Sequence, residues 1–161
     1  MVAKKSILYT GPLGLAAYLS NTVLVDRWNT KAAIESLKPT IQMVTKNKVK
    51  IWFYPEGTRN TNKTEKMLRF KKGAFILAVA TQAPIIPVVY SPYTFEDKNK
   101  YMLDTGYVIM HCLEPIQTEG LTTEDVPALM ERVRNIMMLA YDKLSVEVMT
   151  NLPSKHIDTI L

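Results

Sequence analysis

The sequence predicts an α/β fold with a mostly parallel central sheet flanked by helices. Short apolar, β-branched stretches alternate along the chain with stretches whose apolar residues recur every three or four positions. Strands separated by helices favour parallel pairing through right-handed crossovers. The chain has 161 residues, 47% of them hydrophobic, and no repeat or low-complexity tract. We therefore expect one compact unit with its own core.

The first third of the chain holds short elements. Residues 4–21 contain two helical stretches separated by Gly11-Pro12, and Thr22–Asp26 is a β-branched run that predicts a buried strand. Residues 30–46 carry apolar side chains at helical spacing, which predicts an amphipathic helix with a kink at Pro39.

A second strand is predicted at Val49–Tyr54, which runs directly into the turn residues Pro55-Glu56-Gly57. Residues 60–66 are polar and indicate a surface loop. Residues 71–82 (KKGAFILAVATQ) predict a mostly apolar helix, and Ile85–Ser91 predicts the buried strand that follows it.

The last elements are a strand at Val108–Leu113 and a long helix. Thr122 and Asp125 have the spacing of a capping box, with Asp in place of Glu, and predict the start of this helix. Its apolar residues share one face, which we expect to be buried: Val126, Leu129, Met130, Val133, Met137, Ala140 and Leu144.

Composition limits the classes of protein and partner. The net charge of +5 favours an acidic partner, such as a phosphorylated metabolite or an anionic lipid surface. The single cysteine, Cys112, excludes an internal disulfide framework, and we expect it to be a buried thiol in a strand. No run approaches the roughly 18 apolar residues of a membrane-spanning helix.

The segment Phe53–Arg59 (FYPEGTR) is the main candidate site, because a strand ends there in an α/β sheet, where ligand sites gather. Gly57 allows close approach of the backbone, Arg59 offers a planar fork of donors for a phosphate, and Glu56 can accept from hydroxyls. The alternative is an ordinary turn that carries a Glu56–Arg59 surface ion pair.

A second basic group follows at Arg69-Phe70-Lys71-Lys72-Gly73, at the predicted start of a helix. Basic residues at a helix start oppose the helix dipole, so they are either solvated or present to meet a bound anion. The sequence leaves both interpretations open.

These residues together resemble the glycerol-phosphate and lysophosphatidic acid acyltransferases. Val25-Asp26-Arg27 is similar to the second block of that family, Tyr54–Arg59 to its third and Ala83–Val89 to its fourth, with Phe70–Gly73 between the last two. The resemblance covers residues 3–144, including the segment 118–134, which is similar to the 1-acylglycerol-3-phosphate acyltransferase branch. EGTR alone would be a weak signal, but ordered blocks are specific.

The resemblance implies a glycerolipid acyltransferase fold and transfer of a fatty acyl group from acyl-CoA to the sn-2 hydroxyl of lysophosphatidic acid, giving phosphatidic acid. It implies a membrane surface as partner, phospholipid biosynthesis at the endoplasmic reticulum membrane, and no cofactor or metal beyond the co-substrate acyl-CoA. The substrate-binding residues that it implies are Glu56, Gly57, Thr58, Arg59, Arg27, Lys4, Lys71 and Lys72.

One block of the family is missing from this sequence, namely a histidine followed after four residues by an aspartate, which supplies the catalytic base. The fifth residue after His111 is Ile116 and the fifth after His156 is Leu161, so neither histidine belongs to such a block. We expect a strand histidine and a tail histidine. In the family the block lies upstream of the Ala-Lys pair, before the position of Met1 here.

We therefore expect an acyltransferase domain at residues 1–147 that lacks its first block and is incomplete at its amino-terminal end, followed by a tail at 148–161. A positioned base raises the rate of such a reaction by about 10²–10⁴-fold. Because the block that supplies this base is missing from the sequence, we assign no catalytic residue. The alternative is a non-catalytic lysophospholipid-binding or regulatory fragment. Nucleic-acid binding is disfavoured, because the cations are scattered and no recognition module is present.

Overall fold

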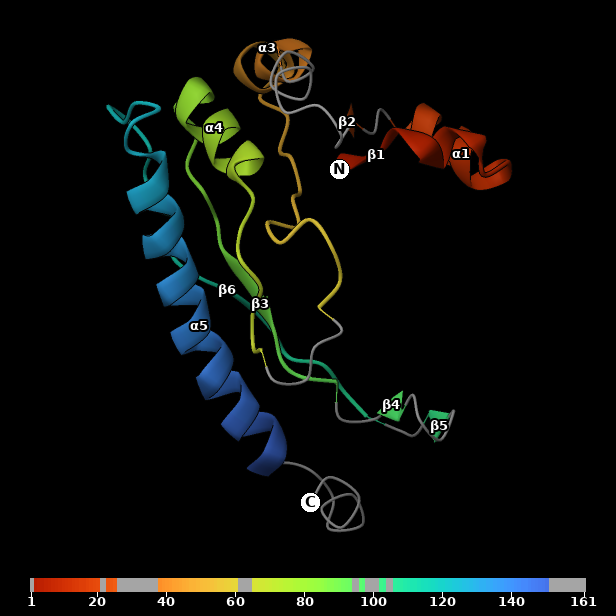
Figure 1. Ribbon diagram of the computed structural model, residues 1–161, viewed down its shortest axis with the longest axis vertical. Coiled ribbons are helices and arrows are strands. Elements are labelled where there is room, and N and C mark those ends of the chain that lie inside the picture. Colours follow the sequence, from red (N-terminus) through yellow and green to blue (C-terminus); the bar gives the residue numbers. More distant parts are fainter. Residues whose placement is uncertain are drawn as a thin grey trace. The chain divides into compact units, whose positions relative to one another are not determined.

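The computed structural model describes residues 2–20, 23–25, 38–60, 65–93, 96–97, 102–103 and 106–150. By their contacts they form two compact units. Unit one comprises Met1–Ala83 and Thr118–Met130, and unit two comprises Pro84–Gln117 and Glu131–Leu161. Figure 1 shows the elements of both units with the labels used below.

Unit one begins with two parallel strands joined by a helical connection. Strand β1 (Val2–Lys4) leads into the 3₁₀ helix η1 (Lys5–Tyr9) and helix α1 (Pro12–Leu19), and strand β2 (Val23–Val25) follows. The two strands pair in parallel, with Lys4 opposite Val25. The two predicted helical stretches are found, and a strand is found at Val23–Val25, whereas the predicted burial of its side chains and the residues Thr22 and Asp26 lie outside what the structure describes.

Helix α3 (Lys38–Asn47) contacts helix α4 (Lys72–Thr81). Pro39 is the second residue of α3, and at this position its missing N–H removes no helical hydrogen bond. Pro39 therefore lies in the first turn of α3, where it does not produce the expected kink. The preceding residues of the predicted helix, 30–37, lie outside the described part of the chain.

The strand predicted at Val49–Tyr54 is wrong as a strand, because these residues form no ladder with any described segment. Burial still alternates from Ile51 to Tyr54, so the chain keeps one side inward and the other outward. Apolar alternation thus predicted the two faces correctly, whereas a strand also needs a hydrogen-bonded neighbour.

Helix α4 matches the helix predicted at residues 71–82. Lys71 is its N-cap residue in extended conformation, and Gln82 ends it in the left-handed conformation at φ 52°. Phe70 stacks on Phe75 with ring centroids 6.0 Å apart. Because Phe70 precedes the N-cap and Phe75 is the fourth helical residue, the pair is a hydrophobic staple that fixes how the chain enters the helix.

Unit two contains strands β3 (Val88–Tyr90) and β6 (Met110–Cys112), which confirm two of the predicted strands and pair antiparallel. The short strands β4 (Glu96–Asp97) and β5 (Met102–Leu103) also pair antiparallel. An isolated antiparallel bridge joins Ile85 to Ile116.

The prediction that Cys112 is buried is wrong. All three residues of β6 are exposed, and the Cys112 thiol is free. Among the described residues β6 pairs on one side only, with β3, so the strand lies at an edge where side chains reach solvent.

Helix α5 (Val126–Thr150) is the longest described element. The apolar face predicted for it is confirmed, since all but Met130 are buried, and Val148 extends the same face toward the end of the helix. The capping box predicted at the start of α5 is found in part. The Asp125 carboxylate accepts hydrogen bonds from the Thr122 N–H at 2.8 Å and the Thr122 hydroxyl at 2.9 Å.

The described strands form three separate pairs, one parallel and two antiparallel, so a continuous parallel sheet is not shown. Two features of the sequence account for this. Pro84 and Pro87 flank the first residues of the predicted strand and cannot donate to a ladder, which keeps β3 short. The connection from β3 to β6 holds no described helix, and an antiparallel pair needs none.

Candidate functional site

The segment Tyr54–Arg59 folds into a tight turn. The Gly57 N–H donates to the Tyr54 carbonyl oxygen at 3.0 Å, and Gly57 has φ +71°, a conformation that L side chains rarely adopt. Only glycine takes up this conformation at little cost. The turn predicted from Pro55-Glu56-Gly57 is thereby confirmed.

Two hydrogen bonds fasten this turn to the chain that leads into α4. The Lys71 N–H donates to the Pro55 carbonyl oxygen at 2.7 Å. The Leu68 N–H donates to Oε2 of Glu56 at 3.1 Å. Met67 and Phe70 on the same stretch are buried, so the turn is attached to a packed segment.

Glu56 and Arg59 form no ion pair with each other. The Glu56 carboxylate faces a backbone N–H, and Arg59 makes no hydrogen bond or ion pair with any described residue. The interpretation of FYPEGTR as a turn carrying a Glu56–Arg59 surface ion pair is therefore wrong. Arg59 and its neighbour Thr58 are exposed and accessible to a ligand.

Lys71 is brought against the turn from the other side. A Cβ atom on Gly57 would lie 3.2 Å from Cγ of Lys71, so the glycine backbone packs against the aliphatic stem of this lysine. Lys71 and Lys72 are both exposed. Lys71 therefore lies beside the turn that carries Arg59.

The start of α4 favours anions. Its first turn contains no acidic residue, and its N-cap Lys71 makes no side-chain capping bond, so the first amides of the helix are not satisfied by a carboxylate. The helix dipole and the two lysines add to the Arg59 charge there. This arrangement can bind a phosphate.

Lys72 also borders a cavity of about 320 Å³ in unit one. The other lining residues are mostly apolar and come from α4 and the start of α5: Ile76, Thr123, Val126 and Pro127. A cavity of this kind, apolar with one cation and one hydroxyl, suits part of an amphiphilic ligand.

Lys4 and Arg27 are the remaining predicted substrate contacts. The backbone of Lys4 ends β1 and lies opposite Val25 of β2, so the carboxyl ends of both parallel strands meet at one edge. Arg27 follows two residues after Val25 but lies outside the described residues, and the side chain of Lys4 is not described either. The pairing places the backbone of Lys4 opposite Val25, the first residue of the Val25-Asp26-Arg27 block.

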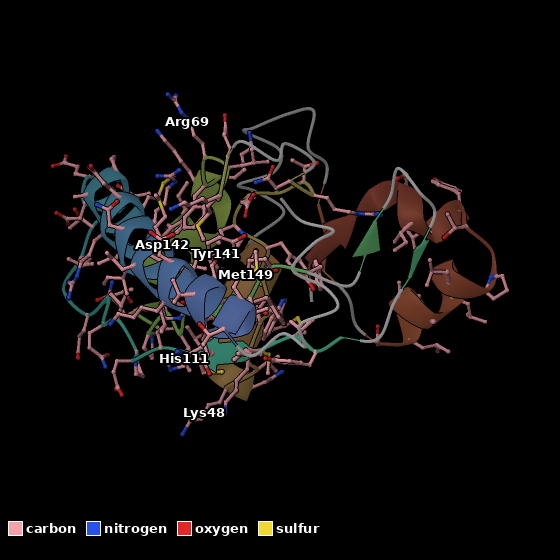
Figure 2. The ribbon with its side chains drawn as sticks, turned by 90° about the horizontal axis from the view of Figure 1, so that it is seen from below. Lys48, Arg69, His111, Tyr141, Asp142 and Met149 are labelled. Atoms are coloured by element: carbon pink, nitrogen blue, oxygen red, sulfur yellow. The ribbon has the colours of Figure 1, made fainter. Side chains whose placement is uncertain are left out.

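Other candidate groups are not drawn into this site. Arg69 is exposed, and Figure 2 shows its side chain extending away from the ribbon. His111, the histidine within the described part of the chain, is an exposed residue of β6 in unit two. His156 lies outside the described residues.

Sequence reasoning missed the segment 67–70, which holds the turn in place through the Leu68 N–H and the buried Met67 and Phe70. Part of this arrangement could have been predicted from the sequence. Phe70 precedes the N-cap and Phe75 is the fourth residue of the helix, which is the pattern of a hydrophobic staple. The Glu56–Leu68 bond had no such signal.

Comparison with known proteins shows the family of the chain. A family model described as Acyltransferase matches residues 1–91, more than half of the chain, and the chain belongs to this acyltransferase family. Over 147 residues the chain is 41% identical to human 1-acyl-sn-glycerol-3-phosphate acyltransferase alpha, covering 91% of this chain and 51% of that protein.

The Saccharomyces cerevisiae 1-acyl-sn-glycerol-3-phosphate acyltransferase is 40% identical over 139 residues, covering 86% of this chain and 46% of the yeast protein. The crystal structure of the 1-acyl-sn-glycerophosphate (LPA) acyltransferase PlsC from Thermotoga maritima superimposes with a TM-score of 0.66 at 27% identity, covering 89% of this chain and 55% of that one. The fold is therefore that of PlsC. The chain spans about half the length of these relatives.

Proposed function

We propose that this chain forms the phosphate-binding part of an enzyme that transfers a fatty acyl group to the sn-2 hydroxyl of lysophosphatidic acid, giving phosphatidic acid. The observation that carries the proposal is Arg59, an exposed and unpaired guanidinium on a rigid turn that is bound to the basic start of α4. The names of the relatives supply the acceptor, a 1-acyl-sn-glycerol 3-phosphate.

The roles of the residues follow from their chemistry. Arg59 grips the phosphate with two parallel N–H donors, while Lys71, Lys72 and the first amides of α4 neutralise its charge. Gly57 and Thr58 let the backbone come close to the bound group. Lys4 and Arg27, from the carboxyl edge of the β1–β2 pair, assist in the same role.

Glu56 receives a different role from the one that the resemblance implied. Its Oε2 atom is already engaged by the Leu68 N–H at 3.1 Å, so the carboxylate holds the turn against the segment before α4. We therefore assign Glu56 to positioning Arg59. A contact from its other oxygen to a glycerol hydroxyl is compatible with this assignment.

The donor in this proposal is acyl-CoA, and no metal or other cofactor takes part. The hydroxyl proton passes to a base as the sn-2 oxygen attacks the thioester carbonyl, the C–S bond breaks, and the base returns the proton to the departing thiolate, so that CoA leaves as the thiol. The residues described here bind and orient the acceptor, and none of them is assigned as that base. The apolar cavity beside Lys72 is where an apolar part of a substrate would fit.

Both the acceptor and the product are membrane lipids, so the proposal places the reaction at a membrane surface, with the endoplasmic reticulum as the compartment that the family resemblance indicates. Within the described residues, no helix combines the length and the apolar character that crossing a bilayer requires.

The proposal is tested by measuring lysophosphatidic acid binding to the full 161-residue chain and to Arg59→Ala, with Arg69→Ala as the matched control. Loss of a charge-assisted contact of about 1.5–3 kcal/mol lowers affinity by about 10- to 100-fold in Arg59→Ala only. Monoacylglycerol, which lacks the phosphate, should bind weakly to all three. Equal losses in both arginine variants would show that only net charge matters.

Incubation of the same proteins with labelled acyl-CoA separates the enzyme from the second candidate, a non-catalytic lysophospholipid-binding module. The observation that favours this candidate is the absence of a histidine-aspartate block from the 161 residues. Phosphate-dependent binding without acyl transfer supports the binding module, whereas transfer that Arg59→Ala abolishes supports the enzyme.

A further inference from the structure

The connection between β1 and β2 exposes an unusual amount of apolar surface. Along η1 and α1 no residue from Ser6 to Leu19 is charged. Five large apolar or aromatic side chains of this stretch are mostly exposed: Tyr9 (85%), Leu13 (59%), Leu15 (60%), Tyr18 (69%) and Leu19 (71%). Contiguous exposed apolar surface of this kind usually marks a contact with a partner or a membrane.

The inner side of this connection is already packed. Gly14 and Ala17 are buried, and a Cβ atom on Gly14 would collide with the Leu8 carbonyl oxygen and lie 2.8 Å from the Ile7 carbonyl oxygen. Helix α1 therefore lies directly on η1, and the two form a helical hairpin, residues Lys5–Leu19. The exposed side chains point away from a contact that the hairpin has already completed.

The hairpin also has a defined place in the fold of unit one. It begins at Lys5, immediately after Lys4, and therefore leaves the sheet at the carboxyl edge where β1 and β2 end (Figure 1). Lys4, one of the predicted phosphate contacts, is the last residue of β1 at this edge.

We propose that the Lys5–Leu19 hairpin inserts its exposed apolar side into the interfacial layer of an anionic lipid bilayer. Charge supports a lipid partner, because the first 25 residues contain Lys4 and Lys5 and no Asp or Glu. Tyr9 and Tyr18 are of the residue type enriched at the membrane interface. Helix α1, eight residues or about 12 Å long, lies within the interface and does not cross the roughly 30 Å apolar layer.

This docking would hold the end of β1 that carries Lys4 near the lipid headgroups, where a lysophosphatidate phosphate resides. That consequence rests on the proposed function, whereas the insertion itself does not. Leu15→Ser with Leu19→Ser should weaken vesicle binding without changing the affinity for monomeric lysophosphatidic acid, whereas Arg59→Ala should lower that affinity, so the failure of one proposal is distinguishable from the failure of the other.

The experiment is co-sedimentation of the full chain with vesicles of phosphatidylcholine, alone or mixed with phosphatidic acid. The test variant is Leu15→Ser with Leu19→Ser. The matched control is Leu139→Ser with Val146→Ser, because these two apolar side chains of α5 are exposed to a similar extent, at 66% and 68%. We expect the unsubstituted chain and the control to bind the mixed vesicles, and the test variant to bind at least about tenfold more weakly.

A second readout follows the hairpin itself. Leu15→Trp should show a blue-shifted emission with mixed vesicles that the unsubstituted chain, which has two tryptophans of its own, does not show. Equal losses in the test and control variants, unchanged binding of the test variant, or the absence of a shift would each overturn the proposal. Self-association that the test variant abolishes, without vesicle binding, would identify a second copy of the chain as the occupant.

Discussion

The carboxylate of Glu56 accepts a hydrogen bond from the Leu68 N–H at 3.1 Å, across twelve positions of sequence. This bond joins the turn that carries Arg59 to the segment that begins α4. Glu56, a residue expected to touch substrate, therefore holds the turn that carries Arg59, the proposed phosphate contact.

Glu56→Ala should lower the free energy of unfolding by about 1–2 kcal/mol, because it removes the acceptor of a partly buried N–H. Glu56→Gln keeps an acceptor oxygen and should cost less than half as much. Denaturant unfolding measures both. Lysophosphatidic acid affinity should follow the same order, and an affinity loss in Glu56→Gln without any loss of stability would instead indicate a direct contact with substrate.

Asp125 makes the stability of the chain depend on pH. Hydrogen bonds from the backbone N–H and then the hydroxyl of Thr122 hold the pKa of Asp125 below its ordinary value. A lowered folded-state pKa stabilises the protein above the unfolded-state pKa, and this contribution disappears as the pH falls through the folded-state value. Asp125→Asn should therefore lower the melting temperature at pH 7, and this difference should shrink as the pH falls below the ordinary aspartate pKa of 3.8 toward the lower folded-state pKa.

Glu124→Gln is the control for that experiment, since Glu124 is an exposed neighbour for which no bond to Thr122 is found. Melting temperatures of the two variants and the unsubstituted chain, taken across this pH range, should converge at low pH for Asp125→Asn only. A constant difference at every pH would mean that the carboxylate charge is not responsible.

Local patterns in the sequence predicted local structure well. The helix at residues 71–82, the buried face of α5 and the bonds between Thr122 and Asp125 all depend on residues within one or two helical turns of each other. The turn at Pro55–Gly57 belongs to the same class, because its conformation is set by Gly57 and its neighbours.

Contacts between distant segments were not predictable in this way. Whether Val49–Tyr54 becomes a strand depends on a neighbouring strand, and the direction of β3 against β6 depends on the path between them. Similarly, the spacing from Glu56 to Leu68 matches no periodic pattern. The turn in FYPEGTR was thus predictable from the sequence, whereas the way that Glu56 and Lys71 fix its geometry was not.

Thr118 links the end of α4 to the segment before α5. It is completely buried, at 0% exposure, and its hydroxyl donates to the Ala83 carbonyl oxygen at 2.9 Å and the Ala78 carbonyl oxygen at 3.3 Å. Thr118→Val keeps the shape but removes the donor to the Ala83 carbonyl oxygen, whereas the Ala78 carbonyl oxygen keeps the Ala83 N–H, and the change should cost about 1–3 kcal/mol.

The matched control is Thr45→Val, because the Thr45 hydroxyl also donates to backbone carbonyls but is exposed on α3. Water replaces that bond, so the change in unfolding free energy should stay within about 0.5 kcal/mol. Denaturant unfolding of both variants checks the comparison, and equal costs would show that burial of Thr118 is not the cause.

Gly57 and Gly73 provide a pair of substitutions with opposite expected signs beside the candidate site. At Gly57, φ is +71° and a new Cβ would press on Cγ of Lys71 at 3.2 Å, so Gly57→Ala should destabilise the chain by about 1–2 kcal/mol. Gly73 lies in α4 with ordinary φ and no atom within 4 Å of the new Cβ, so Gly73→Ala should stabilise it by about 0.5–1 kcal/mol.

Lysophosphatidic acid affinity should separate the two variants further. Gly57→Ala displaces either the turn or Lys71, both of which face the proposed phosphate, and should weaken binding. Gly73→Ala leaves the N–H groups at the start of α4 in place, so affinity should remain unchanged. If Gly73→Ala weakened binding as much as Gly57→Ala, the phosphate would lie against the α4 backbone at Gly73 and not at the turn.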